Sequence, residues 1–364
     1  MSHQETDLII VDYGDLIHDD LSPSSSSSSK TMMMESMEKA FGPNGIGILA
    51  IRNVPDFVKC KLAVLNHAHS LAHLPSKELH ELEDPDSLYN AGWSHGKEML
   101  KPGQPDTAKG SFYFNPIIDV PNPKDREMYP VSYPINRWPK QSLPTLESAA
   151  KRLGRLMKDV AVHVSKHIDA YAQSKNSNYP SKCIYNSLIN TEKVKGRLLY
   201  YFPLPETQTQ SEDSWIGWHN DSGFLTALAG DIYMDKEGTL VVPPQSSSAG
   251  LYVVDRNNQV CKVSIPADCM AIQIGECTQI MTGGAVIATP HCVRGVPNLA
   301  RASLACFIDV PPAVPLSLPP GGATPESIMA MESDRVPTMA KRWKDGITFG
   351  EFLQKTFEAY YNKE

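Results

Sequence analysis

The feature that most constrains this chain is a change of sequence period near residue 195. Beyond that point, short runs with strand-like alternation are separated by Gly, Pro, Asn and Asp, as in half-buried strands joined by turns. Eight runs are expected to be strands: 197–202, 224–233, 238–242, 250–255, 259–265, 269–274, 285–288 and 301–310. So many short strands predict a β-sandwich or jelly roll.

The part of the chain before residue 195 has a different character. Residues 32–41 and 56–74 have helical spacing, and 45–54 is expected to be a short strand between them. A long helix is expected at 146–172, and 348–362 again has helical spacing. The predicted fold class is therefore mostly β with flanking helices: a double-stranded β-helix (jelly-roll) core with an N-terminal α/β extension and a C-terminal helix.

Two segments lack a clear period. Residues 22–29 are nearly pure serine, which predicts a mobile loop because such a run cannot bury apolar area. Residues 84–139 are dense in Pro, Gly and Asn and are expected to be loop-like, with an aromatic run at 110–116 that either lines a ligand site or packs beneath the loop. One elaborated domain is expected, with four regions: helices and loops (1–140), the long helix and its connection (141–194), the jelly-roll core (195–312) and a closing loop and helix (313–364).

Charge and cysteine usage narrow the class of function. The formal net charge is -7 and no long Lys/Arg run occurs, which argues against a nucleic-acid or membrane-binding surface and favours a small-molecule partner. No stretch of 18 apolar residues and no secretory start are found, so a cytosolic location is expected. Seven scattered cysteines without a Cys-x-x-Cys pair predict free thiols. The oligomeric state is not specified.

A candidate metal site lies in the β-region. His219 and Asp221 are two residues apart just before an expected strand, and side chains two apart in an extended chain point to the same side. His291 is well placed to come from a distant strand, and Pro290 restricts the backbone just before it. Two imidazoles and one carboxylate on one face of an octahedron hold iron(II) and leave three positions open.

A candidate carboxylate site follows ten residues later. Arg301 and Ser303 are again two apart at the start of an expected strand, so both side chains share one face. The guanidinium is a rigid, permanently charged fork that matches a carboxylate. A dicarboxylate could bridge this pair and the metal. Two histidine pairs at helical i, i+4 spacing, His69 with His73 and His163 with His167, lack a third ligand and are expected to face solvent.

The order His219-x-Asp221, His291, Arg301-x-Ser303 resembles the iron(II)/2-oxoglutarate dioxygenases of the isopenicillin N synthase-like group. The likeness extends to residues 45–57 and to Arg197-Leu-Leu-Tyr-Tyr-Phe-Pro203, which is similar to the family's Arg-Leu-Asn-Tyr-Tyr-Pro-Pro segment. It implies Fe(II), 2-oxoglutarate as cosubstrate and O2, with ascorbate as an optional reductant. It also implies that Tyr201 donates a hydrogen bond to the cosubstrate, while Leu199 replaces the family's Asn.

The resemblance implies a dioxygenase, an oxidoreductase of specialised metabolism. Such an enzyme couples decarboxylation of 2-oxoglutarate to succinate with oxidation of a small organic metabolite, hydroxylation being the default outcome. Relatives that halogenate have a small residue in place of the carboxylate ligand, so Asp221 argues against halogenation. Two alternatives stay open: an iron oxidase of the same fold that works without 2-oxoglutarate, and a non-enzymatic metabolite-binding jelly roll. The sequence does not identify the substrate.

Overall fold

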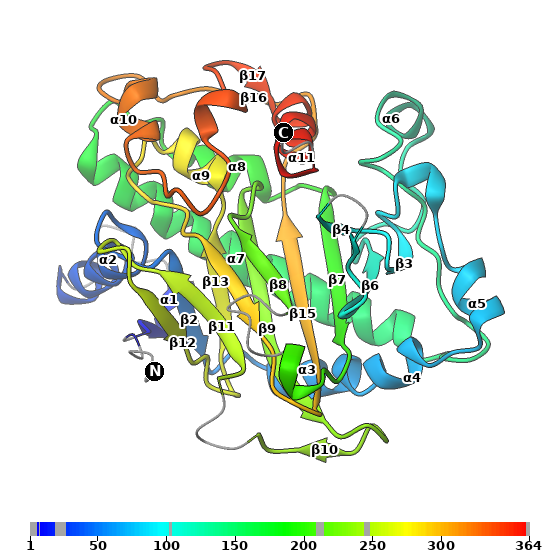
Figure 1. Ribbon diagram of the computed structural model, residues 1–364. Coiled ribbons are helices and arrows are strands. Elements are labelled where there is room, and N and C mark those ends of the chain that lie inside the picture. Colours follow the sequence, from blue (N-terminus) through cyan, green and yellow to red (C-terminus); the bar gives the residue numbers. More distant parts are fainter. Residues whose placement is uncertain are drawn as a thin grey trace.

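The computed structural model describes residues 6, 8–18, 27–101, 104–208, 215–243 and 248–361. A large sheet runs through the centre in the order β1 (Ile10–Asp12), β2 (Ile48–Arg52), β13 (Met270–Ile274), β9 (Leu225–Met234), β15 (Ala300–Ile308), β7 (Val194–Tyr201), β6 (Lys109–Phe114) and β3 (Gly92–His95), with β10 (Leu240–Val241) beside β9 (Figure 1). All of its pairs are antiparallel except β1 with β2.

A smaller sheet faces the large one. Its order is β12 (Val260–Val263), β11 (Gly250–Val254), β14 (His291–Arg294) and β8 (Ile216–His219). Two short ribbons lie apart: β4 (Met99–Lys101) with β5 (Gln104–Pro105), and β16 (Pro315–Leu316) with β17 (Ile347–Thr348). Apolar side chains of both sheets, such as Leu199 from the large one and Val253 from the small one, form a single buried cluster. The two sheets therefore enclose an interior, as in a jelly roll.

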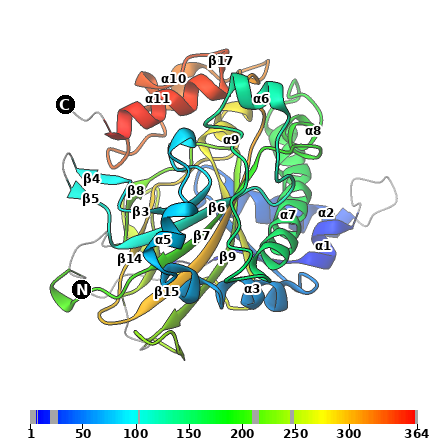
Figure 2. The same cartoon turned by 90° about the vertical axis from the view of Figure 1, so that its right-hand side faces the viewer.

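Helices flank the sheets, and the long helix α7, at Leu146–Lys175, packs on the outer face of the large one. The helices are α1 (Tyr13–Ile17), α2 (Ser27–Phe41), α3 (Phe57–Leu65), α4 (Ala68–Ala72), α5 (Ser76–Glu81), α6 (Pro123–Met128), α7 (Leu146–Lys175), α8 (Cys183–Leu188), α9 (Glu276–Met281), α10 (Pro325–Met329) and α11 (Phe349–Tyr361), with 3-10 turns at Pro85–Ser87, Glu206–Gln208 and Met339–Lys341. Figure 2 shows α7 with α1 and α2 on one side of the strands and β8 and β14 on the other. Within the described ranges, every helix is too short or too polar to cross a bilayer.

Alternation along the strands separates the helix-covered face from the interior. Leu198 and Tyr200 of β7 belong to the main apolar core, which the stripe of α7 completes with residues such as Val160. Leu199 and Tyr201 point the other way, toward the smaller sheet. Period-2 alternation thus divides β7 between a structural face and an interior face.

The predicted fold class is confirmed: the protein is mostly β, with a jelly-roll core and flanking helices. The long helix is also present and ends three residues later than expected, at Lys175. Seven of the eight expected strand runs contain a strand, but the prediction at 285–288 is wrong. There the backbone amides of Ile287 and Ala288 bond to the Phe41 carbonyl and the Gln279 side chain rather than to a neighbouring strand.

The expectation of a loop-like segment at 84–139 is wrong in its central part. β3 and β6 lie within it, and β6 joins the large sheet beside β7. The aromatic run is that strand: Phe112 and Phe114 pack on Trp138 under the helices, while Tyr113 faces the opposite way. Gly110 within this six-residue strand, and Pro on both sides of it, concealed the strand in the sequence.

The structure describes only the end of the serine run. Residues 22–26 of the predicted mobile loop lie outside the described residues, and Ser27 to Ser29 form the start of α2 rather than a loop.

Candidate functional site

His219, Asp221 and His291 meet at one end of the smaller sheet. His219 is the last residue of β8 and His291 the first of β14, and strand pairing sets them directly opposite each other. Asp221 follows two residues after β8. Its Oδ1 lies 4.0 Å from His219 Nε2 and 3.8 Å from His291 Nε2, and the three ligand atoms all lie within 4.8 Å of one another. Among the described residues this is the only such cluster of three or more.

The donor set fits a divalent metal. His219 Nδ1 lies 2.8 Å from the Gly217 carbonyl, so its N–H donates there and the Nε2 lone pair faces Asp221. Burial lowers the pKa of His219, and the neighbouring His291 lowers it further, so the imidazole is neutral at pH 7. The Asp221 Oδ2 atom is buried without a hydrogen-bond partner in the described part of the chain. A neutral His219 imidazole beside an unpartnered carboxylate is what a cation would satisfy.

Gln273 of β13 contacts His291 at Nδ1, the ring nitrogen that faces away from Asp221. The side-chain nitrogen of Gln273 lies 2.6 Å from His291 Nδ1, which also lies 3.1 Å from the Thr289 carbonyl, and the Gln273 side-chain oxygen is buried without a partner among the described residues. If His291 Nε2 binds a metal, Nδ1 carries the proton, so the Gln273 amide must turn and present its oxygen to the ring. The amide nitrogen then points into the interior as a donor. Gln273 could not be predicted from the sequence, because nothing local links β13 to β14.

An interior cavity of about 90 Å³ contains the triad and the predicted carboxylate site. Arg301 and Ser303 share one face of β15, with Nη1 3.5 Å from Oγ, and both line the cavity. Tyr201, opposite Arg301 in the register, stacks its ring 4.9 Å from the guanidinium. The structure thus brings all six predicted site residues to one cavity.

Arg301 has a partner that the sequence analysis did not anticipate. Its Nε donates to Asp231 of β9 at 2.7 Å, because Asp231 is opposite Ser303 in the strand register. This contact fixes the guanidinium and leaves its other end for a ligand. Leu199, the departure from the family pattern, also lines the cavity and offers an apolar surface where the family has an amide.

Two further groups of polar residues were missed. Asn220, which lies between His219 and Asp221 in the sequence, donates a hydrogen bond to Glu276 at 3.1 Å. Arg342 donates to both carboxylate oxygens of Glu276, each at 2.7 Å. On the other side of the cavity, Arg197 pairs with Glu98 at 2.8 Å. Each contact joins residues more than 50 positions apart, so no local sequence signal could have revealed it.

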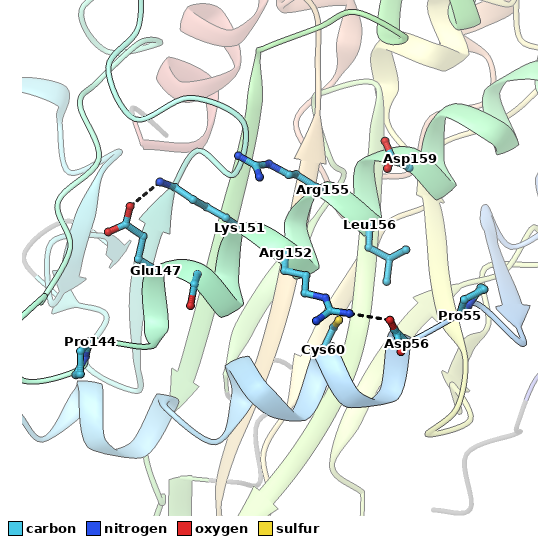
Figure 3. A pocket seen from close by; sticks show the side chains of 11 residues that line it. Pro55, Asp56, Cys60, Pro144, Glu147, Lys151, Arg152, Arg155, Leu156 and Asp159 are labelled. Atoms are coloured by element: carbon cyan, nitrogen blue, oxygen red, sulfur yellow. Dashed lines mark hydrogen bonds and ion pairs between the residues drawn. The ribbon is translucent and has the colours of Figure 1, made fainter.

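A larger hollow lies elsewhere. A groove of about 650 Å³ lies between α3 and α7, on the helix-covered side of the large sheet. Figure 3 shows the side chains that line it. Its basic residues already have partners: Arg152 pairs with Asp56 at 2.7 Å, and Lys151 with Glu147 at 2.6 Å. The groove lies on the face of the sheet opposite the triad, and the chemistry is therefore placed in the smaller interior cavity.

The remaining histidine and cysteine predictions had mixed outcomes. His167 is buried and bonds to the Leu16 carbonyl at 2.9 Å, so the expectation of a solvent-facing side chain is wrong there. His69 and His73 stack on each other with ring centres 4.2 Å apart. The seven cysteines are free thiols, as predicted.

No family model and no curated protein sequence matches the chain. Solved structures do. A protein from Caulobacter crescentus assigned to the 2OG-Fe(II) oxygenase family is 18% identical with a TM-score of 0.68, covering 96% of this chain and 98% of that one. A full-length Neurospora crassa protein in complex with alpha-KG and thymine is 17% identical, with a TM-score of 0.67 and 97% of each chain covered.

The dioxygenase for auxin oxidation in rice is 15% identical, with a TM-score of 0.59, and the match covers 98% of this chain and 96% of that one. At such identities the likeness concerns the fold alone, and it extends over nearly the whole length of each chain. The chain therefore has the jelly-roll fold of the 2OG-Fe(II) oxygenases.

Proposed function

We propose that the protein is an iron(II)- and 2-oxoglutarate-dependent oxygenase that oxidises, by default hydroxylates, a small organic molecule. The observation that carries the proposal is the convergence of His219, Asp221 and His291 in a cavity that also contains Arg301 and Ser303. Two imidazoles and one carboxylate are the ligand set of non-haem iron oxygenases. Iron bound there would supply the oxidative chemistry with O2.

The protein's own residues hold and orient the reactants. Arg301, fixed by Asp231, and Ser303 would take the distal carboxylate of 2-oxoglutarate, with Tyr201 beside them as the predicted hydrogen-bond donor. Apolar lining residues such as Leu228 and Leu251 limit water around the reacting groups.

The similar structures support a small-molecule substrate. The Neurospora crassa protein was crystallised with alpha-KG and thymine, and the rice protein is a dioxygenase for auxin oxidation. The order of the metal-ligand candidates and of the Arg301-x-Ser303 pair along the sequence further supports membership of the isopenicillin N synthase-like group. We also propose a cytosolic location and a role in specialised metabolism, on the sequence features alone.

Turnover tests this proposal against its alternatives. The purified protein is supplied with iron(II), O2 and ascorbate, with and without 2-oxoglutarate, and succinate is quantified. Slow succinate formation that requires both iron and 2-oxoglutarate is expected, even without the substrate. O2 consumption without 2-oxoglutarate would favour the oxidase, and no consumption under any condition would favour the binding protein.

A further inference from the structure

A row of basic side chains lies along the interior face of β7. Lys195 and Arg197 of β7 are two residues apart and share the strand face of Leu199 and Tyr201, and Lys193 directly precedes the strand. The residues between them, such as Val194 and Leu198, pack in the main core under the helices. Strand alternation therefore directs Lys195 and Arg197 away from that core, to the face that borders the cavity.

Two of these cations have no acidic partner. Lys195 Nζ donates to the Asn90 side-chain oxygen at 3.2 Å, and Lys193 Nζ to the Ser132 carbonyl at 2.8 Å. Neither lies within ion-pair distance of a carboxylate of the described chain, although both are partly buried. Arg197, by contrast, pairs with Glu98, which Lys109 also contacts at 3.0 Å.

The charges in this neighbourhood do not balance. Apart from the triad, four basic side chains face three carboxyl groups: Lys109, Lys193, Lys195 and Arg197 against Glu98, Asp106 and Asp309. Asp309, whose charge attracts both lysines, accepts a hydrogen bond from the Phe224 backbone amide, and burial raises the pKa of its carboxyl group. At least one positive charge is left uncompensated. Burying an uncompensated charge is costly unless a ligand neutralises it.

The uncompensated charge lies beside the cavity. Arg197 lines the cavity, and so does Phe307, whose ring centre lies 5.6 Å from Lys195 Nζ. The Tyr113 ring lies 5.1 Å from the Arg197 guanidinium and 5.4 Å from Lys195 Nζ. We call the Lys195 and Arg197 side chains the basic wall. The basic wall is separate from Arg301, the predicted anchor of 2-oxoglutarate. Arg301 is opposite Tyr201 in the strand register, and Tyr201 is four residues, or roughly 13 Å, along β7 from Arg197.

We propose that the substrate carries a carboxylate group, which Lys195 and Arg197 bind at this wall. The proposal rests on the proposed function, since it names the class of molecule that the oxygenase cavity takes. A carboxylate would compensate the excess positive charge, and the guanidinium and ammonium together offer donors to both carboxylate oxygens. The apolar side chains around the triad would contact the remainder of the substrate.

The test compares acids with their uncharged analogues. Butyrate, benzoate and phenylacetate are titrated calorimetrically into the anaerobic protein with iron(II) and 2-oxoglutarate, beside butyramide, benzamide and phenylacetamide. Each acid and its amide have nearly the same shape, so a difference in affinity reports the charge. At least one acid should bind about tenfold or more tightly than its amide. Equal affinities, or no binding of any acid, would overturn the proposal.

Variants locate the charge preference. Lys195→Met should reduce the preference about tenfold, and Lys195→Arg should keep most of it. The Met variant should fold, because it removes a buried cation without an acidic partner. Lys140→Met, at an exposed lysine, is the matched control and should change nothing.

The outcomes also separate this proposal from the one on which it rests. An undiminished preference in Lys195→Met would place the acids elsewhere, for example on the iron, and would overturn the assignment of this wall. Iron-dependent succinate formation without any acid preference would leave the oxygenase standing and reject the carboxylate substrate. An acid preference that Lys195→Met removes, in a protein without succinate formation, would support the wall and reject the oxygenase.

Discussion

At His291, the orientation of one ring depends on residues outside the triad. Its Nδ1 is held between the Gln273 amide and the Thr289 carbonyl, which aims Nε2 at Asp221. Such supporting contacts typically change metal affinity by 10- to 100-fold.

Gln273→Leu should therefore weaken iron(II) binding by about tenfold or more while leaving the protein folded. Gln273→Glu keeps an oxygen acceptor for the Nδ1 proton and should weaken binding less. Iron affinity by competition with a chelator dye measures the effect, and thermal melting provides the folding control. Wild-type iron affinity in Gln273→Leu would mean that the Thr289 carbonyl alone orients the ring.

Arg301→Leu should spare iron but weaken 2-oxoglutarate binding by roughly 10- to 100-fold, the value of a charge-assisted contact of about 1.5 to 3 kcal/mol. Arg301→Lys should be intermediate, because a point charge replaces the fork. Ser303→Ala should cost about 1 kcal/mol. The Leu variant also leaves Asp231 without its partner, so melting must be measured beside the titration. Unchanged 2-oxoglutarate affinity in Arg301→Leu would favour the oxidase that works without this cosubstrate.

Lys195 predicts a pH dependence of stability. Burial lowers the pKa of Lys195 to about 8, from an ordinary value of 10.5. Below pH 8 the folded state bears the full cost of the buried charge. Between pH 8 and 10.5 the folded protein releases the proton while the unfolded chain retains it, so stability rises with pH. Urea unfolding at pH 7, 8, 9 and 10 should show wild type gaining stability relative to Lys195→Met. A constant difference across that range would contradict the shift.

At the scale of elements, the C-terminal part of the chain supports the loop that carries Asp221. Arg342, which follows a 3-10 turn, binds Glu276 at the start of α9 with two contacts of 2.7 Å. Glu276 in turn accepts from Asn220, and its backbone amide bonds to the Asp221 carbonyl at 2.8 Å. The Tyr360 hydroxyl of α11 accepts a hydrogen bond from the backbone amide of Asn220. One ion pair therefore links the closing segment to the candidate metal site.

Arg342→Met should destabilise the fold by about 3 to 5 kcal/mol, because it leaves the Glu276 carboxylate buried and unpaired. It should also weaken iron binding. Arg152→Met is the matched control: it breaks an Arg–carboxylate pair of the same 2.7 Å length, but an exposed one, and should cost at most about 1 kcal/mol. Urea unfolding gives both values, and similar losses in the two variants would contradict the role assigned to the buried pair.

The elements that the sequence predicted best were those in which a regular pattern of apolar residues repeats over many positions. The α7 stripe runs along a helix of 30 residues, and the strands after residue 195 alternate between two buried faces. β6 was missed because a strand of six residues that contains a Gly shows too little alternation to be recognised. β8 was missed too, although it ends on His219, because four residues give only two positions per face.

At the scale of the whole molecule, the sequence predicted which residues meet but not what holds them. The i, i+2 spacings of His219 with Asp221 and of Arg301 with Ser303 are local, so the strand period was enough to pair each set. The partners of those residues are distant in the chain: Gln273 for His291, and Asp231 for Arg301. Such contacts depend on strand order and register, which composition and period do not determine.

Anaerobic titration of iron(II) and then 2-oxoglutarate tests the central claim most directly. Chelation of the metal by the 2-oxo acid produces a visible charge-transfer band. Wild type should develop the band with one iron and one 2-oxoglutarate per chain. Asp221→Ala should lose it while melting as a folded protein, and Asp235→Ala, at a surface turn, should keep it. An undiminished band in Asp221→Ala, or no band in wild type, would contradict the assignment of His219, Asp221 and His291 as the iron site.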